Sequence, residues 1–341
     1  GRTLRGMDFL LGLPAGVHVA AAASVLCAGH LFSIWLRRPR IKVSGKHVVI
    51  TGGSQGLGKA LALLCVQRGA RVTIVARTAS KLEEACAEIG QAGEGFSNRI
   101  QHAVLDVGAA SCEQVTATLQ QAARTFGRVD VFVANAGTGN GMLIIGSPTA
   151  EVQQTLETQV AVNLVGGLRC VIAAAQLMVS DGEGGRVSIV SSVAGLATCP
   201  GYAIYSATKF GHRGFLAGAY EEFRRHGVHL SVFYPGSIRT PGFASEQAQM
   251  PLVTQKIEAQ CSDVSSAESC ARVLLGGIEG GSREITNEFF PSLLVDTPTG
   301  GCTPLDALTW AFAQVVKGPT ALYVRFMARR YISAPGRRGS L

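Results

Sequence analysis

Short apolar runs alternate with longer amphipathic stretches through the middle of this chain. Six such runs occur, at residues 47–51, 71–76, 100–105, 129–134, 186–191 and 229–234. Apolar runs of strand length that alternate with helical patterns predict a parallel sheet with helices on both faces. Ligands in such sheets bind beyond the carboxyl ends of the strands. We therefore predict one doubly wound α/β domain over residues 44–290.

An uncharged stretch precedes this domain. Residues 9–36 contain no Asp, Glu, Lys or Arg over 28 positions, and the basic sequence Arg37-Arg38-Pro39-Arg40 follows. About 20 apolar residues are enough for a helix to cross a bilayer. The apolar core of a cleaved signal peptide is shorter, so we predict an uncleaved transmembrane helix, with residues 1–43 as membrane anchor and basic linker. Met7 is a candidate start of the native chain, with residues 1–6 as an upstream extension.

A second apolar region covers residues 289–328. Its two uncharged halves, 307–316 and 320–324, are each too short to span a bilayer alone. Two interpretations stay open: a membrane-associated hairpin or interfacial segment, and an ordinary pair of packed helices that closes the substrate pocket. We treat residues 291–341 as an apolar C-terminal segment with a basic tail.

The positive charge of the chain lies at its two ends. The net charge is +8, whereas residues 1–46 and 317–341 each carry +6, which leaves −4 for the middle. A nucleic-acid-binding domain would carry its basic stripe on the folded part, so we predict no nucleic-acid partner. Basic ends beside apolar runs, in a chain with 47% hydrophobic residues, instead favour contact with an anionic membrane surface.

The nine cysteines show no spacing typical of a metal site or a redox motif. Several of them fall within apolar patterns, as expected of small buried side chains. Free thiols and the absence of an Asn-x-Ser/Thr sequon favour a reducing compartment over the secretory lumen. We therefore predict no metal site and a domain that faces the cytosol.

A glycine-rich turn follows the first apolar run and precedes a helical pattern. Its sequence is Thr51-Gly52-Gly53-Ser54-Gln55-Gly56-Leu57-Gly58. A strand, a glycine turn and a helix form the context of a dinucleotide site, because the glycines admit a pyrophosphate to the helix N-terminus. The residues predicted to bind the cofactor are Gly52, Ser54, Gln55, Gly56 and Gly58.

The residues after the second run indicate which dinucleotide binds. An NAD-preferring enzyme usually has an acidic residue about twenty positions beyond the glycines, bonded to the ribose 2′-hydroxyl. No acid stands there; Arg77 follows the run and Lys81 comes one helical turn later. Because these cations suit a 2′-phosphate, we predict NADPH or NADP as the cofactor.

Tyr205 and Lys209 stand four residues apart, so a helix would place them on one face. A phenol titrates near pH ~10, and the positive charge of a neighbouring lysine favours the phenolate and lowers that pKa. Ser191 and Ser192 precede Tyr205 by fourteen and thirteen residues, and a serine hydroxyl can hold a reacting oxygen. This combination predicts a proton donor for the reduction of a carbonyl group.

These motifs, in this order, resemble the short-chain dehydrogenase/reductase family over residues 44–290. The resemblance implies a Rossmann-type fold and a catalytic tetrad, matched here by Asn163, Ser192, Tyr205 and Lys209. Ser192 is preferred to Ser191 because thirteen residues before the tyrosine is the usual family interval. Tyr205 and Lys209 are also implied to contact the cofactor. Further cofactor contacts are implied at Asp106 near the adenine, at Asn135 after the fourth strand, and at Ile238 and Thr240 beside the nicotinamide.

The region after the sixth run resembles the 3-ketodihydrosphingosine reductases in particular. It contains Thr240-Pro241-Gly242-Phe243, then Glu246, and then Pro251, Thr254 and Ile257 in the spacing of that group. The resemblance implies NADPH-dependent reduction of a long-chain lipid ketone to dihydrosphingosine, at the cytosolic face of the endoplasmic reticulum membrane. The chain departs from the group in its Pro235-Gly236 pair and in the stretch Thr138-Gly139-Asn140-Gly141.

The basic residues after the first apolar stretch predict its orientation in the membrane. Five of them, at positions 37, 38, 40, 42 and 46, follow residue 36, and positive charge favours the cytosolic side. Two other functions stay open: a membrane-anchored reductase for a steroid or retinoid, and a membrane scaffold without activity. The intact tetrad argues against the scaffold. The sequence leaves the oligomeric state open, a homo-oligomer included.

Overall fold

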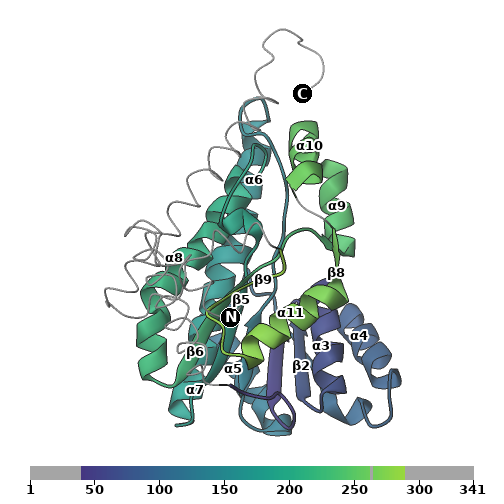
Figure 1. Cartoon of the computed structure of the whole chain (residues 1–341), viewed down its shortest axis with the longest axis vertical. Helices are drawn as coiled ribbons and strands as arrows, with labels where there is room; N and C mark the ends of the chain where they lie inside the picture. The colour runs from purple at the N-terminus through teal and green to yellow at the C-terminus, as the bar shows by residue number, and fades with distance from the viewer. Residues whose placement is uncertain (1–39, 262–263, 289–341) are drawn as a thin grey trace, which may run out of the picture.

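Seven parallel strands form the centre of the computed structural model, which describes residues 40–261 and 264–288 (Figure 1). In chain order the strands are β1 (His47–Thr51), β2 (Arg71–Ala76), β3 (Ile100–Val104), β4 (Val131–Ala134), β5 (Gly185–Val190), β6 (Val228–Tyr234) and β9 (Glu284–Thr286). The sheet order is β3-β2-β1-β4-β5-β6-β9, and every pairing is parallel. All six predicted runs form strands whose ends agree to within two residues, so the predicted parallel α/β fold is confirmed.

The edge strand β9 is absent from the sequence-based prediction. It has 3 residues, of which only Ile285 is apolar, so it shows no run or alternation. It pairs with Val232, Phe233 and Tyr234 of β6, and Ile285 is buried in the core. Tertiary pairing rather than local pattern therefore makes this strand.

The order of the strands reverses between β1 and β4. β1 pairs with β2 on one side and with β4 on the other. The chain crosses from β3 back to β4 through helix α5 (Cys112–Phe126). Loops that leave β1 and β4 therefore diverge and form a crevice at the carboxyl ends of the strands. The glycine turn and Asn135 follow these two strands and so lie at this crevice.

Helices cover both faces of the sheet (Figure 1). The helices on one face are α3 (Gly56–Gln67), α4 (Ala79–Gln91) and α11 (Ala267–Glu279), and those on the other are α5, α7 (Gly167–Ser180) and α8 (Ala203–Arg225). Side chains alternate along a strand, so Val48 and Ile50 enter the first core while Val49 enters the second. Because both faces are covered, the strands are apolar at nearly every position, which explains the continuous runs in the sequence.

One continuous helix of 32 residues, Thr149–Ser180, belongs to the second face. It joins α6 (Thr149–Gln159), the π-helical turn η2 (Val160–Gly166) and α7. In the described part of the chain it is the one helix long and apolar enough to cross a membrane, but half of its apolar window is buried inside the domain. Since α7 packs against β4, β5 and α5, we interpret it as a core helix.

The predicted membrane helix at 9–36, the candidate start Met7 and the apolar region 289–328 lie outside the described residues. The membrane anchor therefore stays a prediction from the sequence. The described chain is packed on the domain from its first residues, since the Ile41 amide donates to the Glu279 carbonyl at 2.9 Å.

Two short helices, α9 (Pro241–Gln249) and α10 (Leu252–Cys261), project beyond the sheet between β6 and α11, and we call them the arm (Figure 1). The small strands β7 (Ile238–Arg239) and β8 (Ser265–Ser266) pair at its base. Thr240 caps α9, because its Oγ1 accepts from the Phe243 amide at 3.1 Å. The Thr254 hydroxyl of α10 donates to the Pro200 carbonyl at 2.8 Å and so docks the arm on the domain.

Candidate active site

A cavity of about 1380 Å³ opens at the carboxyl ends of the strands, between the glycine turn and the arm. Most of the predicted site residues line it, namely Gly52, Ser54, Gln55, Gly56, Arg77, Lys81, Asp106, Asn135, Ser192, Tyr205, Lys209, Ile238 and Thr240. Gly58 and Asn163 are the two that do not line the wall. Both support it from behind, through contacts with the glycine turn and with the loop after β4.

The glycine turn depends on conformations and contacts that favour glycine. Gly52 and Gly56 have φ of +65° and +55°, in the left-handed region. A Cβ atom on Gly58 would lie 2.2 Å from the Gly52 carbonyl oxygen, so this glycine lets α3 approach the turn. Gln55, the N-cap of α3, forms no side-chain cap hydrogen bond. The first amide groups of α3 are thus left for an anion, and the turn fits a pyrophosphate.

Asn135 ties the end of β4 to the glycine turn. Its Nδ2 donates to the carbonyls of Thr51 and Gly52 at 3.0 and 3.1 Å. Thr51 Oγ1 in turn accepts from the amides of Asn135 and Ala136, both at 3.0 Å. The side-chain amide nitrogen of Asn135, a predicted cofactor contact, therefore bonds backbone carbonyls. Asn135 thereby positions the glycine turn at the point where the strand order reverses.

Two cations stand at the end of the cavity next to β2. Arg77 directly follows β2, and Lys81 lies in the first turn of α4; both are exposed. Neither forms an ion pair with another described residue. Asp106 follows β3, and its Oδ1 accepts from the Gly108 amide at 3.0 Å. This end of the cavity therefore holds two cations that form no ion pair with a described residue, and one acid, Asp106. This agrees with the sequence-based prediction that the adenosine portion of the cofactor binds here.

Ile238 and Thr240 lie at the base of the arm, just before α9, and close the other side of the glycine turn. The methyl group of Thr240 would lie 2.9 Å from a Cβ atom on Gly56, so the base of the arm rests directly on the turn. Both residues line the cavity between this turn and Tyr205. That location agrees with their predicted place beside the nicotinamide, which stays a prediction.

Helix α8 presents Tyr205 and Lys209 on the face that lines the cavity. Burial has the largest effect on the pKa of the Tyr205 hydroxyl and raises it, whereas the neighbouring Ser192 hydroxyl lowers it. The Lys209 Nζ lies 5.5 Å from the centroid of the Tyr205 ring and donates to the Val190 carbonyl at 3.1 Å. The Ser191 hydroxyl donates instead to the Lys209 carbonyl at 3.0 Å. Ser192, the preferred serine, is therefore the one that faces the tyrosine.

Asn163 lies within the π-helical turn η2, a conformation found often at functional sites. Its Oδ1 accepts from the Thr138 amide and its Nδ2 donates to the Thr138 carbonyl, both at 2.8 Å. This side chain thus fixes the loop after β4. A Cβ atom on Gly137 in this loop would lie 3.3 Å from Asn163 Oδ1 and 3.6 Å from Lys209 Nζ.

His212, which the sequence analysis does not single out, completes this group. It follows Lys209 by one helical turn, is 2% exposed, and its Nε2 bonds the Asn163 carbonyl at 2.9 Å. Burial, and then the charge of Lys209, lower the pKa of His212 to about 3. The imidazole is therefore neutral and donates from Nε2. Its helical spacing from Lys209 is the signal that could have identified it.

The ionisation of the catalytic pair differs from the sequence-based expectation. Burial, and then the charge of Glu246, raise the pKa of Tyr205 above its usual range, whereas the neighbouring lysine was expected to lower it. Burial also lowers the pKa of Lys209 to about 8. Desolvation disfavours both the phenolate and the ammonium, and it therefore explains both pKa shifts. The phenol consequently stays protonated, as a proton donor must.

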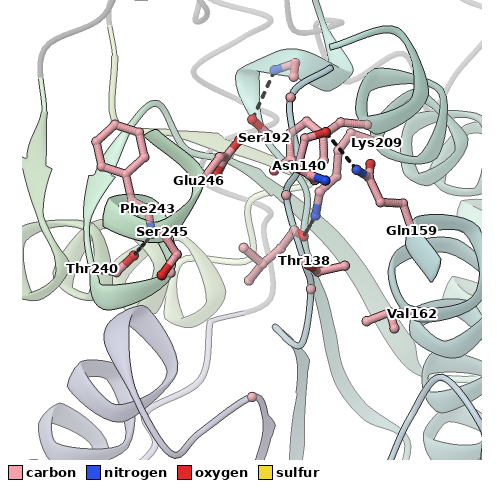
Figure 2. Close-up of a pocket in the computed structure, with 18 of the residues that line it drawn as sticks. Thr138, Asn140, Gln159, Val162, Ser192, Lys209, Thr240, Phe243, Ser245 and Glu246 are labelled. Carbon is pink, nitrogen blue, oxygen red and sulfur yellow. Dashed lines mark hydrogen bonds between the residues drawn. The ribbon is translucent and has the colours of Figure 1, made fainter. Parts of the chain in front are cut away.

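The arm contributes polar residues to which the sequence analysis assigns no role in the site. Glu246 projects from α9 into the pocket (Figure 2), and the Tyr202 hydroxyl nearby donates to Met250 Sδ at 3.9 Å. Glu258 on α10 accepts from the Ser237 hydroxyl at 2.5 Å. A Cβ atom on Gly139 would lie 2.7 Å from the Glu246 carboxylate. Gly139 is the signal in the sequence, because a glycine at this position permits the close approach of the Glu246 carboxylate.

Comparisons with known proteins concern the same residues. The family model for short chain dehydrogenases matches residues 46–251. A 3-dehydrosphinganine reductase of Danio rerio is 32% identical over 281 residues, 81% of this chain and 81% of its own. A 3-dehydrosphinganine reductase of Arabidopsis thaliana is 32% identical over 85% of this chain and 86% of its own. The crystal structure of a short-chain type dehydrogenase/reductase from Mycobacterium marinum matches with a TM-score of 0.61 and 25% identity, over 72% of this chain and 94% of that one.

Proposed function

This chain belongs to the short-chain dehydrogenase/reductase family, and from that premise we propose that it reduces the ketone of 3-ketodihydrosphingosine, also called 3-dehydrosphinganine, to dihydrosphingosine. Membership makes it an oxidoreductase with a nicotinamide cofactor. The observation that carries the proposal is that one cavity joins the glycine turn to the Ser192–Tyr205 pair. The names of the two relatives support the choice of substrate, since each is a reductase of this amino ketone.

The residues of the site have distinct tasks in this reaction. Bound NADPH supplies the hydride that the ketone carbon accepts. The hydroxyls of Ser192 and Tyr205 hold the ketone oxygen, and Tyr205 transfers its proton to that oxygen as the alcohol forms. Lys209, when protonated, stabilises the phenolate that remains until it recovers a proton. Asn163 acts indirectly, by holding the loop at Thr138 against this face of the pocket.

The preference for NADPH over NADH is part of the proposal. Arg77 and Lys81 line the cavity, and no described residue forms an ion pair with them. A 2′-phosphate would supply the missing negative charge, whereas a ribose hydroxyl would leave both cations unpaired. No acid occupies the position at the end of β2 that would bond the ribose of NADH.

We extend the proposal to the location of the protein. Residues 9–36 would anchor it in the endoplasmic reticulum membrane, and the basic residues from 37 to 46 favour the cytosol for the domain. The substrate carries a long acyl chain and lies in the same bilayer, so the anchor would raise its local concentration. Protease added to sealed microsomes should destroy the activity. Protection of the domain until detergent is added would refute this orientation.

The direct test is NADPH oxidation by the purified full-length chain in detergent, with 3-ketodihydrosphingosine as substrate and dihydrosphingosine identified as product. Tyr205→Phe serves as the inactive control. A panel of steroid and retinoid ketones distinguishes the related reductases. Turnover of a steroid or retinoid without turnover of the amino ketone would replace the proposed substrate, and absence of turnover with every ketone would favour the scaffold.

A further inference from the structure

The two ends of the cavity differ in their charged side chains. Arg77 and Lys81 stand with Asp106 at the end that suits the adenosine portion of the cofactor, while Glu246 and Glu258 lie at the end next to Tyr205. Glu151 and Glu288 also line the cavity wall. Lys209 is the cation of the end next to Tyr205, and its ammonium is committed to the Val190 carbonyl at 3.1 Å. Within the described residues, neither Glu246 nor Glu258 forms an ion pair. The substrate end therefore carries more negative than positive charge.

Glu246 is held at the pocket by contacts that orient its carboxylate. It projects from α9, it is half-buried, and a Cβ atom on Gly139 would lie 2.7 Å from its Oε2 and 2.8 Å from its Oε1. The glycine therefore makes room for both oxygens. The Tyr202 hydroxyl, at the N-terminal end of α8, donates to Met250 Sδ at 3.9 Å. Burial raises the pKa of the Glu246 carboxylate, and the nearby Tyr202 hydroxyl lowers it less strongly. A carboxylate offers about four lone-pair sites, which can accept hydrogen bonds from a ligand.

The negative charge of Glu246 and Glu258 opposes proton transfer from Tyr205. The charge of Glu246, and less strongly that of Glu258, raises the pKa of Tyr205 and so disfavours the phenolate that proton transfer leaves. Burial in turn raises the pKa of Glu246 itself. Both effects would be relieved by a positive charge placed between the carboxylates and the tyrosine.

We propose that the Glu246 carboxylate binds the ammonium group of the substrate, and that Glu246 thereby determines specificity for 2-amino ketones. The inference rests on the proposed function. In 3-ketodihydrosphingosine the amino group is carried on the carbon next to the ketone. Once the ketone oxygen lies on Ser192 and Tyr205, the ammonium must lie close beside them, where Glu246 stands. The three N–H donors of an ammonium match the free acceptor sites of the carboxylate.

Glu258 has a secondary place in this arrangement. Its carboxylate already accepts from the Ser237 hydroxyl at 2.5 Å, and its effect on Tyr205 is weaker than that of Glu246. It therefore adds negative potential to the pocket without direct contact. We expect Glu258→Gln to weaken selection for the amino group less than Glu246→Gln does.

The test compares two ketones that differ only in the amino group. The substrates are 3-ketodihydrosphingosine and its des-amino analogue, 1-hydroxyoctadecan-3-one, with NADPH and the full-length chain. Glu246→Gln should lower kcat/KM for the amino ketone roughly 10- to 100-fold, the value of a charge-assisted hydrogen bond. It should leave kcat/KM for the des-amino ketone unchanged or higher. Glu246→Asp, which keeps the charge, should recover part of the selectivity.

Glu157→Gln is the matched control, because this exposed carboxylate on α6 lies outside the cavity. NADPH binding and the melting temperature of each variant show that the fold is intact. Equal losses with both ketones, or no loss with the amino ketone, would overturn the role of Glu246. A wild-type protein that reduces neither ketone would instead refute the proposed function, and with it the inference. The two failures are thus distinguished by the wild-type rate.

Discussion

The two sides of the cavity are built in different ways. On the cofactor side, glycines allow one backbone segment to pack directly against another. A Cβ atom on Gly58 would lie 2.2 Å from the Gly52 carbonyl oxygen, and a Cβ atom on Gly52 would lie 2.9 Å from the Ala136 Cα. On the substrate side, Gly139 faces the end of a side chain on the arm, since a Cβ atom there would lie 2.7 Å from the Glu246 carboxylate. Glycine permits a close approach on both sides, but backbone atoms approach it on the cofactor side and side-chain atoms approach it on the substrate side.

This difference separates the part of the cavity that binds the cofactor, which every reaction of this kind requires, from the part that selects the substrate. A nicotinamide dinucleotide has one shape, so the turn that holds it is fixed by backbone contacts that tolerate no added atom. Ketones vary, and the surface that meets them consists of a loop and two short helices whose side chains can be exchanged. We expect changes on the cofactor side to affect every substrate alike, and changes on the arm to alter selectivity.

Tyr205→Phe removes the hydroxyl that lies between the cofactor side and the substrate side of the cavity. We expect it to have the largest effect on activity. Loss of the proton donor is expected to lower kcat by about 10²–10⁴-fold. The ring is retained, so the affinity for NADPH, measured by fluorescence titration, should stay close to that of the wild type. A variant with wild-type turnover would remove Tyr205 from its assigned role.

Arg77→Ala tests the cofactor side at the 2′-phosphate. A charge-assisted hydrogen bond contributes about 1.5–3 kcal/mol, so kcat/KM with NADPH should fall roughly ten- to a hundredfold. The value with NADH, which lacks the phosphate, should change little. The ratio of the two cofactors is the measurement, and an equal loss with both would mean that Arg77 does not contact the phosphate.

Gly58→Ala adds one methyl group at a position where the Gly52 carbonyl oxygen leaves no room for it. The Gly52 carbonyl cannot move without the rest of the turn, so we expect a destabilisation of about 1–3 kcal/mol, typical of overpacking, together with weaker NADPH binding. Chemical denaturation measures the first effect and titration the second. Gly214→Ala is the matched control, because nothing lies within 4 Å of the added atom. That helical substitution should stabilise the protein by about 0.4–1 kcal/mol.

The pH dependence of the reaction should reflect Lys209, which lies between the two sides. Because burial lowers the pKa of Lys209 to about 8, the ammonium is lost as pH rises through that value. We expect kcat/KM for NADPH to be flat below this pH and to fall about tenfold per unit above it.

Stability should move in the opposite direction over the same range. The folded-state pKa of Lys209 lies below its ordinary value of 10.5, so the unfolded chain binds more protons between about 8 and 10.5. The free energy of unfolding contributed by this group therefore rises with pH in that window. An activity loss accompanied by alkaline unfolding would contradict the assignment.

Sequence patterns predict the cofactor side well because its determinants are local. Strands covered on both faces must be apolar throughout, so β1 and β2 are predicted to the residue. The turn at Gly52 is read from spacing alone, since backbone approach requires glycine. Tyr205 and Lys209 share one helical face for the same local reason. By contrast, β9 is stabilised by pairing with β6 and has no pattern of its own.

The substrate side could be predicted only in part, because its contacts join segments far apart in the chain. Glu246 meets Gly139 and Tyr202 from a different element, and no spacing records such a contact. The direction of the Tyr205 pKa shift was wrong for a related reason. The spacing of Tyr205 and Lys209 in the sequence predicts that a lysine lies near the tyrosine. The sequence does not predict that Tyr205 is buried or that Glu246 of the arm lies nearby, and these two factors raise the pKa of the tyrosine.

Gly139→Ala gives the smallest expected effect and the sharpest contrast with Gly58→Ala. The obstacle at Gly139 is the end of a flexible side chain, so the Glu246 carboxylate can rotate away at a cost of about 0.5–1.5 kcal/mol. We expect a roughly two- to tenfold loss of kcat/KM for the amino ketone, little change for the des-amino ketone, and an unaltered melting temperature. The double variant with Glu246→Gln should match Glu246→Gln alone, because both changes act through one carboxylate and their effects cannot add. Additive losses would mean that Gly139 shapes the loop after β4 independently of Glu246, and that selectivity does not depend on this contact.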